Sequence, residues 1–68
     1  MPLDAEDREY VISTALDLLR HRKRRRLVQL LGERLARGDY TDPREQDLDR
    51  IAHALAEAVD REFGEEGG

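Results

Sequence analysis

The most concentrated chemistry in the sequence is a run of cations, RHRKRRRL, at residues 20–27. Half of the twelve Lys and Arg residues of the chain stand in it: Arg20, Arg22, Lys23, Arg24, Arg25 and Arg26. Guanidinium groups form paired hydrogen bonds with carboxylates and phosphates. The run therefore predicts a surface for an anionic partner, which is either an acidic protein or the phosphate backbone of a nucleic acid.

The charge of the whole chain favours the protein partner. The formal net charge is −4, so removing the six cations leaves −10 on the remaining residues. Dedicated nucleic-acid domains are usually basic, and no aromatic residue stands beside the run to stack on bases. We expect a protein partner with an acidic surface, and nucleic-acid binding through Arg20 to Arg26 is the alternative.

The sequence offers little for catalysis or metal binding. It has no cysteine, and its two histidines, His21 and His53, are far apart and outside any metal-ligand motif. Carboxylates such as Asp47 and Asp49 are abundant, but so short a chain lacks the deep pocket that would tune one as an acid. We expect a non-enzymatic protein without catalytic residues, cofactor or metal.

The composition predicts an all-α fold. The chain is 41% charged and 38% hydrophobic, and no stretch alternates strictly between apolar and polar residues as a half-buried strand does. No apolar run approaches the roughly 20 residues of a membrane span. The N-terminal residues lack the basic start and apolar core of a signal peptide. We therefore expect a cytoplasmic protein that makes no membrane contact.

Capping signals mark helix ends. Asp4 fits an N-cap, with acidic residues following it in the first turn. Gly38 fits the left-handed position after a helix. Asp42 fits the next N-cap, Pro43 the first helical position, and Glu45 the third position of a capping box. These signals predict a turn over residues 38–42.

The spacing of the apolar residues between Asp4 and Gly38 indicates whether this segment forms one helix or two. At 100° per residue, the apolar residues of 11–19 and those of 27–35 face directions about 130° apart. One straight helix cannot point both sets at one core, so we expect a break within residues 20–26. The predicted fold is a three-helix bundle with helices near 5–20, 24–37 and 43–63. The alternative is one continuous helix of about 50 Å in a helical hairpin that dimerises into a four-helix bundle.

A chain of 68 residues is short of core. Domains of this size bury only about 60% of the surface that the unfolded chain exposes, and oligomerisation commonly makes up the deficit. We expect one domain over residues 1–63, a flexible acidic and glycine-containing tail over 64–68, and a homodimer. The function predicted is that of a regulatory or adaptor module acting through protein–protein interaction and self-association. The expected core and dimer seam comprises Leu16, Leu19, Leu27, Leu31, Leu48, Ile51, Leu55 and Val59.

Overall fold

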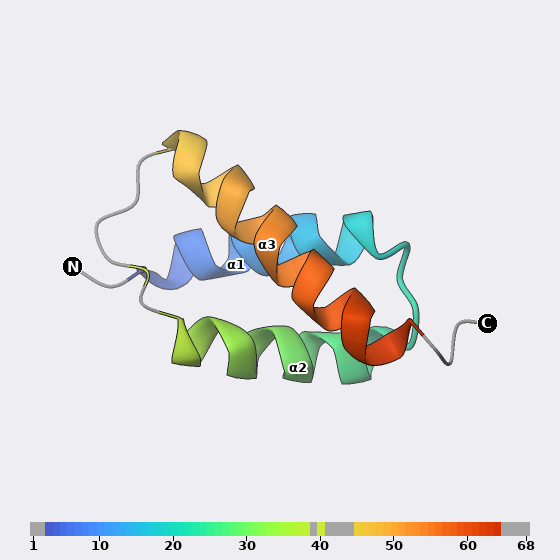
Figure 1. The fold of residues 1–68 in the computed structure, drawn as a ribbon. Helices are drawn as coiled ribbons and strands as arrows, with labels where there is room; N and C mark the ends of the chain where they lie inside the picture. Colours follow the sequence, from blue (N-terminus) through green and yellow to red (C-terminus); the bar gives the residue numbers. More distant parts are fainter. Residues whose placement is uncertain (1–2, 39, 41–44, 65–68) are drawn as a thin grey trace.

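The computed structural model describes residues 3–38, 40 and 45–64, and all regular structure in them is α-helical. The helices are α1 (Ala5–Leu18), α2 (Arg24–Arg37) and α3 (Glu45–Phe63). Helices α1 and α2 run antiparallel to each other, and α3 crosses them diagonally, ending near the turn that joins α1 to α2 (Figure 1). The all-α three-helix prediction is confirmed, and the alternative of one continuous helix is wrong.

The start of α1 has the predicted cap. Asp4 has an extended backbone, and its carboxylate accepts a hydrogen bond of 2.8 Å from the backbone N–H of Asp7. Glu6 and Asp7 lie in the first turn, where carboxylates complement the positive end of the helix dipole. The Asp4 N-cap is therefore confirmed.

The end of α1 forms a hydrogen-bonded motif that commonly contains glycine. The N–H of Arg20 donates to the carbonyl of Asp17 at 3.1 Å, and the N–H of His21 donates to that of Leu16 at 3.2 Å. Together these bonds form a Schellman motif, in which Arg20 occupies the left-handed position with a φ of 58°. The chain thus reverses over residues 19–23 without a glycine or proline.

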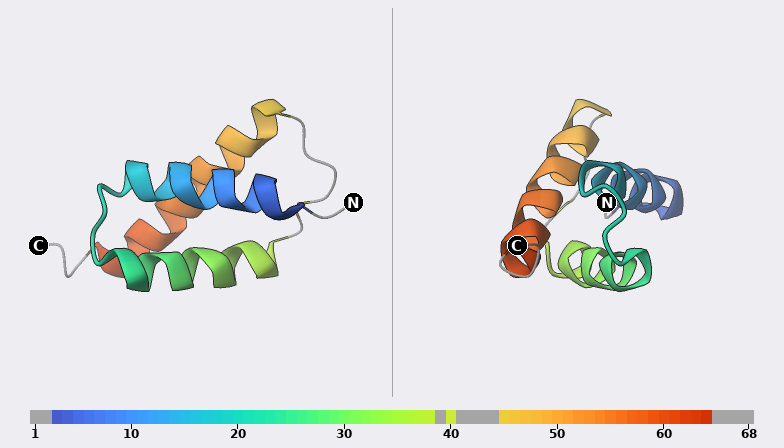
Figure 2. Two further views of the ribbon diagram at one scale, coloured as in Figure 1. Left: turned by 180° about the vertical axis from the view of Figure 1, so that it is seen from behind. Right: turned by 90° about the vertical axis from the view of Figure 1, so that its right-hand side faces the viewer.

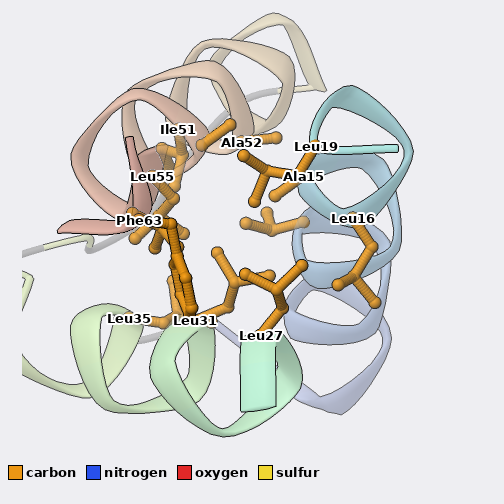
Figure 3. Packing of buried hydrophobic residues seen from close by; sticks show 13 residues of the cluster. Ala15, Leu16, Leu19, Leu27, Leu31, Leu35, Ile51, Ala52, Leu55 and Phe63 are labelled. Atoms are coloured by element: carbon orange, nitrogen blue, oxygen red, sulfur yellow. The ribbon is translucent and has the colours of Figure 1, made fainter. Parts of the chain in front are cut away.

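The core lies among the three helices, each of which contributes side chains to it (Figure 3). Leu27, Leu31, Val11 and Val59 are its largest fully buried side chains. The two apolar sets whose phases differ in the sequence both reach this core, because the turn reorients α2 relative to α1. The buried cluster comprises Val11, Ala15, Leu16, Leu19, Leu27, Leu31, Leu35, Ile51, Ala52, Leu55, Ala56, Val59 and Phe63.

The end of α2 differs from its prediction. Gly38 caps the helix with φ −70° and ψ 150°, an extended conformation that any residue can adopt, so the predicted left-handed glycine is wrong. A Cβ atom at residue 38 would instead collide with the ring of Tyr40, which packs against the core. A side chain at residue 38 would therefore require the ring of Tyr40 to move. The predicted N-cap Asp42 and the predicted first helical residue Pro43 lie outside the described residues.

Helix α3 covers only one side of the α1–α2 pair (Figure 2). The end-on view shows α3 on one flank of the pair, and among the described residues no element covers the opposite flank. The N-terminal half of α3 lies toward the start of α1, and its C-terminal end lies beside the turn between α1 and α2. The fold therefore brings the C-terminal end of α3, with its carboxylates, close to the basic run.

Candidate partner-binding surface

The six cations of the run form one exposed surface, which we call the basic cluster. Arg20, Arg22 and Lys23 lie in the turn, and the other three form the first turn of α2. Every one of them is exposed. The sequence thus predicts a dense group of cations, and the structure holds that group at one end of the bundle, where a large partner can reach it. Its members are Arg20, Arg22, Lys23, Arg24, Arg25 and Arg26.

The backbone that carries the cluster is strained. Arg20, His21 and Lys23 have φ values of 58°, 60° and 34°. For a residue with a Cβ atom, the left-handed region costs roughly 1–2 kcal/mol relative to the right-handed one. Three such residues stand within four positions of the turn, and glycine or asparagine would adopt these angles more easily.

The first turn of α2 is electrostatically unfavourable. Arg24, Arg25 and Arg26 occupy it with no acidic residue among them, and Lys23 at the N-cap makes no side-chain capping bond. Cations at this end oppose the helix dipole, at about 0.3–1 kcal/mol for each exposed charge. Helix α1 shows the favourable arrangement, with a capping Asp4 and carboxylates in its first turn. The basic cluster therefore lowers the stability of the helix that it begins.

Asp60 of α3 pairs with the cluster. Arg22 donates to Asp60 at 3.0 Å, and both side chains are about half exposed. Such pairs contribute about 0–1 kcal/mol, so this pair orients the turn more than it stabilises the bundle. Nε2 of His21 lies 3.5 Å from Oδ1 of Asp17, in the last turn of α1.

The other α3 acids make different contacts. Asp49 accepts a hydrogen bond of 2.6 Å from the hydroxyl of Tyr10, and Glu62 pairs with Arg34 of α2. The backbone carbonyl of Asp49 also accepts a bond of 2.8 Å from Nδ1–H of His53. The Tyr10–Asp49 and Arg34–Glu62 contacts tie α3 to α1 and α2 at residues outside the basic run.

A hollow of about 430 Å³ adjoins the cluster between the end of α1 and α3. Arg20 and Arg22 line one part of it, and Leu18, which is 43% exposed, lines another. An exposed leucine beside cations offers an apolar contact next to a charged one. The sequence did not single out Leu18, because, of the adjacent pair Leu18 and Leu19, only Leu18 is exposed.

The residues predicted for the core and dimer seam lie inside the bundle with one exception. Seven of them are buried, and Leu48 is partly buried at the edge of the core. Their burial within one copy means that they are not on offer to a second copy. The dimer seam at these residues stays a prediction. The seven buried residues are Leu16, Leu19, Leu27, Leu31, Ile51, Leu55 and Val59.

Neither metal binding nor membrane spanning is supported by the described part of the chain. Residues 3–38, 40 and 45–64 hold no group of three or more His, Asp or Glu side chains arranged for a metal ion. Within the same residues, no helix is both long and apolar enough to cross a bilayer.

No protein-family model, curated protein or solved structure matches the chain. The basic cluster and the hollow beside Leu18 are therefore the candidate site on physical grounds alone.

Proposed function

We propose that the protein is a small non-enzymatic regulatory or adaptor module that self-associates in the cytoplasm and binds another protein through the basic cluster. The partner presents carboxylates to the cluster and an apolar side chain to the hollow beside Leu18. Arg20 and Arg22 line that hollow, so one partner segment can meet charge and apolar surface together.

The observation that carries this proposal is the energetic cost of the cluster. Three of its turn residues have left-handed backbone angles, and three cations stand at the end of α2 where carboxylates would be favourable. Local rules are broken most often at functional sites, and burial of the leucines of α2 does not require cations in its first turn. The partner offsets the electrostatic part of this cost, because its carboxylates neutralise cations that oppose the helix dipole.

A protein partner is favoured over nucleic acid by the surroundings of the cluster. Leu18, Leu19 and Ala56 line the hollow together with Arg20 and Arg22, so apolar surface stands next to the cations. An apolar contact at Leu18 also has no natural use against a sugar-phosphate chain, whereas hydrophobic anchors are common in protein interfaces. Nucleic-acid binding remains the rival outcome of the test below.

The test uses three fluorescein-labelled probes: a short peptide of glutamates and leucines, the same peptide with serines for leucines, and a short DNA duplex. We expect tightest binding to the leucine-containing peptide. Leu18→Ser should remove that preference and leave the serine peptide unaffected. Replacing Arg22, Arg24, Arg25 and Arg26 by Gln should abolish binding to both peptides, while circular dichroism shows an intact fold.

Saturable binding of the DNA duplex at physiological salt, tighter than that of either peptide and lost in the quadruple Gln variant, would establish the nucleic-acid alternative instead. In that case affinity would fall steeply with salt, with a log–log slope approaching roughly −5 when all six cations contact phosphates. No binding of any probe would refute both functions of the cluster.

A further inference from the structure

The hollow beside Leu18 carries charges of both signs. We call it the α1/α3 hollow, because it lies between the end of α1 and one side of α3. Arg20 and Arg22 line it from the turn, whereas Glu57 and Asp60 line it from α3. A partner that enters this hollow therefore meets two guanidinium groups and two carboxylates. The apolar part of the lining consists of Leu18, Leu19 and Ala56.

The four charges of the α1/α3 hollow differ in whether they are paired. Arg22 and Asp60 neutralise each other through their contact of 3.0 Å. Within the described part of the chain, neither the guanidinium of Arg20 nor the carboxylate of Glu57 takes part in an ion pair or a hydrogen bond. Both side chains are exposed, so water solvates them in the free protein. The hollow thus has one cation and one anion that a partner can pair with.

These two unpaired charges lie at different places along the hollow. Glu57 precedes Asp60 by three residues on α3, so it lies on the same side of the helix and about 4.5 Å further along its axis. The C-terminal end of α3 lies beside the turn that carries Arg20 (Figure 1). The hollow is therefore positive at the turn and negative about one helical turn away from it.

A partner that covers the α1/α3 hollow removes water from both unpaired charges. A charge that loses its water without gaining an opposite charge or hydrogen bonds raises the free energy of the complex. A carboxylate of the partner satisfies Arg20, but a second carboxylate beside it repels Glu57. A wholly acidic segment, or a phosphate backbone, therefore suits only the turn end of the hollow.

We propose that the partner segment carries a lysine or arginine beside its apolar side chain, and that Glu57 selects this cation. The carboxylates of the segment meet Arg20 and the rest of the basic cluster, its apolar side chain meets Leu18, and its cation meets Glu57. Glu57 thus determines specificity, because it favours a segment of mixed charge and penalises a wholly acidic one. This inference rests on the proposed partner binding and adds the chemistry of the partner.

The test uses three fluorescein-labelled peptides that share a run of glutamates and one leucine. They differ only in the residue two positions after the leucine, which is Lys, Gln or Glu, because residues two apart lie on the same side of an extended peptide. At physiological salt, the wild-type chain should bind the Lys peptide about two- to fivefold more tightly than the Gln peptide. This order opposes the net charge of the peptides, since the Lys peptide is the least acidic.

Glu57→Gln should remove the preference for lysine. We expect it to weaken binding of the Lys peptide about two- to fivefold and to strengthen binding of the Glu peptide. A change in net charge or stability cannot produce this crossover, because it shifts the affinity for all three peptides in the same direction. The matched control is Glu33→Gln, the same change at an exposed residue of α2 outside the hollow, which should keep the wild-type order.

Charge reversal sharpens the test. Glu57→Lys places a cation where the partner's cation should lie, so this variant should bind the Glu peptide most tightly and the Lys peptide least tightly. Glu33→Lys adds the same charge outside the hollow and should not invert the order. Circular dichroism of all four variants checks that the bundle remains folded.

Equal binding of the Lys and Gln peptides by the wild-type chain would overturn the inference and leave the proposed partner binding standing. So would a preference for lysine that survives in Glu57→Gln. No binding of any of the three peptides would refute the partner binding itself, and this inference with it.

Discussion

The turn from α1 to α2, over residues 19–23, contains neither glycine nor proline, whereas the segment from α2 to α3 contains Gly38 and Pro43. The first turn nevertheless reverses the chain tightly, with Arg20 in the left-handed position of a Schellman motif. The second begins at a glycine whose backbone is extended. A helix can thus end without glycine or proline. The presence of a glycine does not by itself determine the backbone angles at the helix end.

The physical reason is the phase of the apolar residues. A continuous helix through residues 19–23 would expose either the apolar set of α1 or that of α2. Burying one leucine side chain contributes about 1.5–3 kcal/mol, and α2 buries Leu27, Leu31 and Leu35. This gain exceeds the roughly 1–2 kcal/mol that each left-handed residue of the turn costs. Tertiary burial therefore overrides local backbone preference in this turn.

The largest effect expected from this comparison is at the first apolar residue after each connection. Leu27 is 0% exposed and follows the first turn, whereas Leu48 follows the second and is only partly buried. Leu27→Ala should cost about 2–5 kcal/mol of unfolding free energy, and Leu48→Ala clearly less. Urea titration followed by circular dichroism measures both. Equal losses of unfolding free energy at the two sites would contradict the inference that burial of the apolar residues of α2 causes the first turn.

The next effect concerns Gly38. Its backbone angles suit valine, but a side chain would collide with the ring of Tyr40. Gly38→Val should therefore cost about 1–3 kcal/mol through overpacking. The same substitution in a Tyr40→Ala background should be nearly neutral. A cost that survives the removal of Tyr40 would mean that the backbone itself requires glycine, and thermal melts of the four chains of this cycle decide the point.

A smaller effect tests the caps. Asp4→Ala removes a capping bond that the structure contains and should cost about 0.5–2 kcal/mol. Asp42→Ala should cost a similar amount if Asp42 caps α3 as the sequence predicts. If Asp4→Ala lowers the stability and Asp42→Ala does not, Asp42 does not cap α3. Thermal unfolding of the two single variants gives this comparison directly.

Much of the fold could be predicted from the sequence, because phase is a property of residue spacing alone. The break between α1 and α2, the Asp4 cap and the exposed cation run all follow from such local patterns. The left-handed angles of Arg20, His21 and Lys23 could not be predicted, because these residue types rarely adopt them without tertiary packing that compensates the cost. The hollow beside Leu18 was equally hidden, since it depends on how α3 crosses α1.

The smallest expected effect has the opposite sign. Arg20→Gly should stabilise the bundle by up to about 1 kcal/mol, because glycine relieves the left-handed strain and loses some of that gain to backbone entropy. Arg22→Gly is the matched control. It removes the same charge from the cluster, but Arg22 is not among the positive-φ residues and pairs with Asp60, so it should destabilise the bundle. Stabilisation by both changes would mean that charge repulsion, and not backbone strain, limits the turn.

The six cations of the basic cluster are neighbours in the sequence, and this affects how much a bound ligand can stabilise the fold. A ligand raises the melting temperature only to the extent that it binds the native chain better than the unfolded chain. The unfolded chain keeps all six cations of residues 20–26 side by side, so a polyanion held by charge alone should shift the melting temperature little. A partner that also contacts Leu18 and the Arg22–Asp60 pair uses a surface that exists only after folding. Ligand-induced thermal stabilisation therefore separates recognition of the folded surface from simple charge attraction.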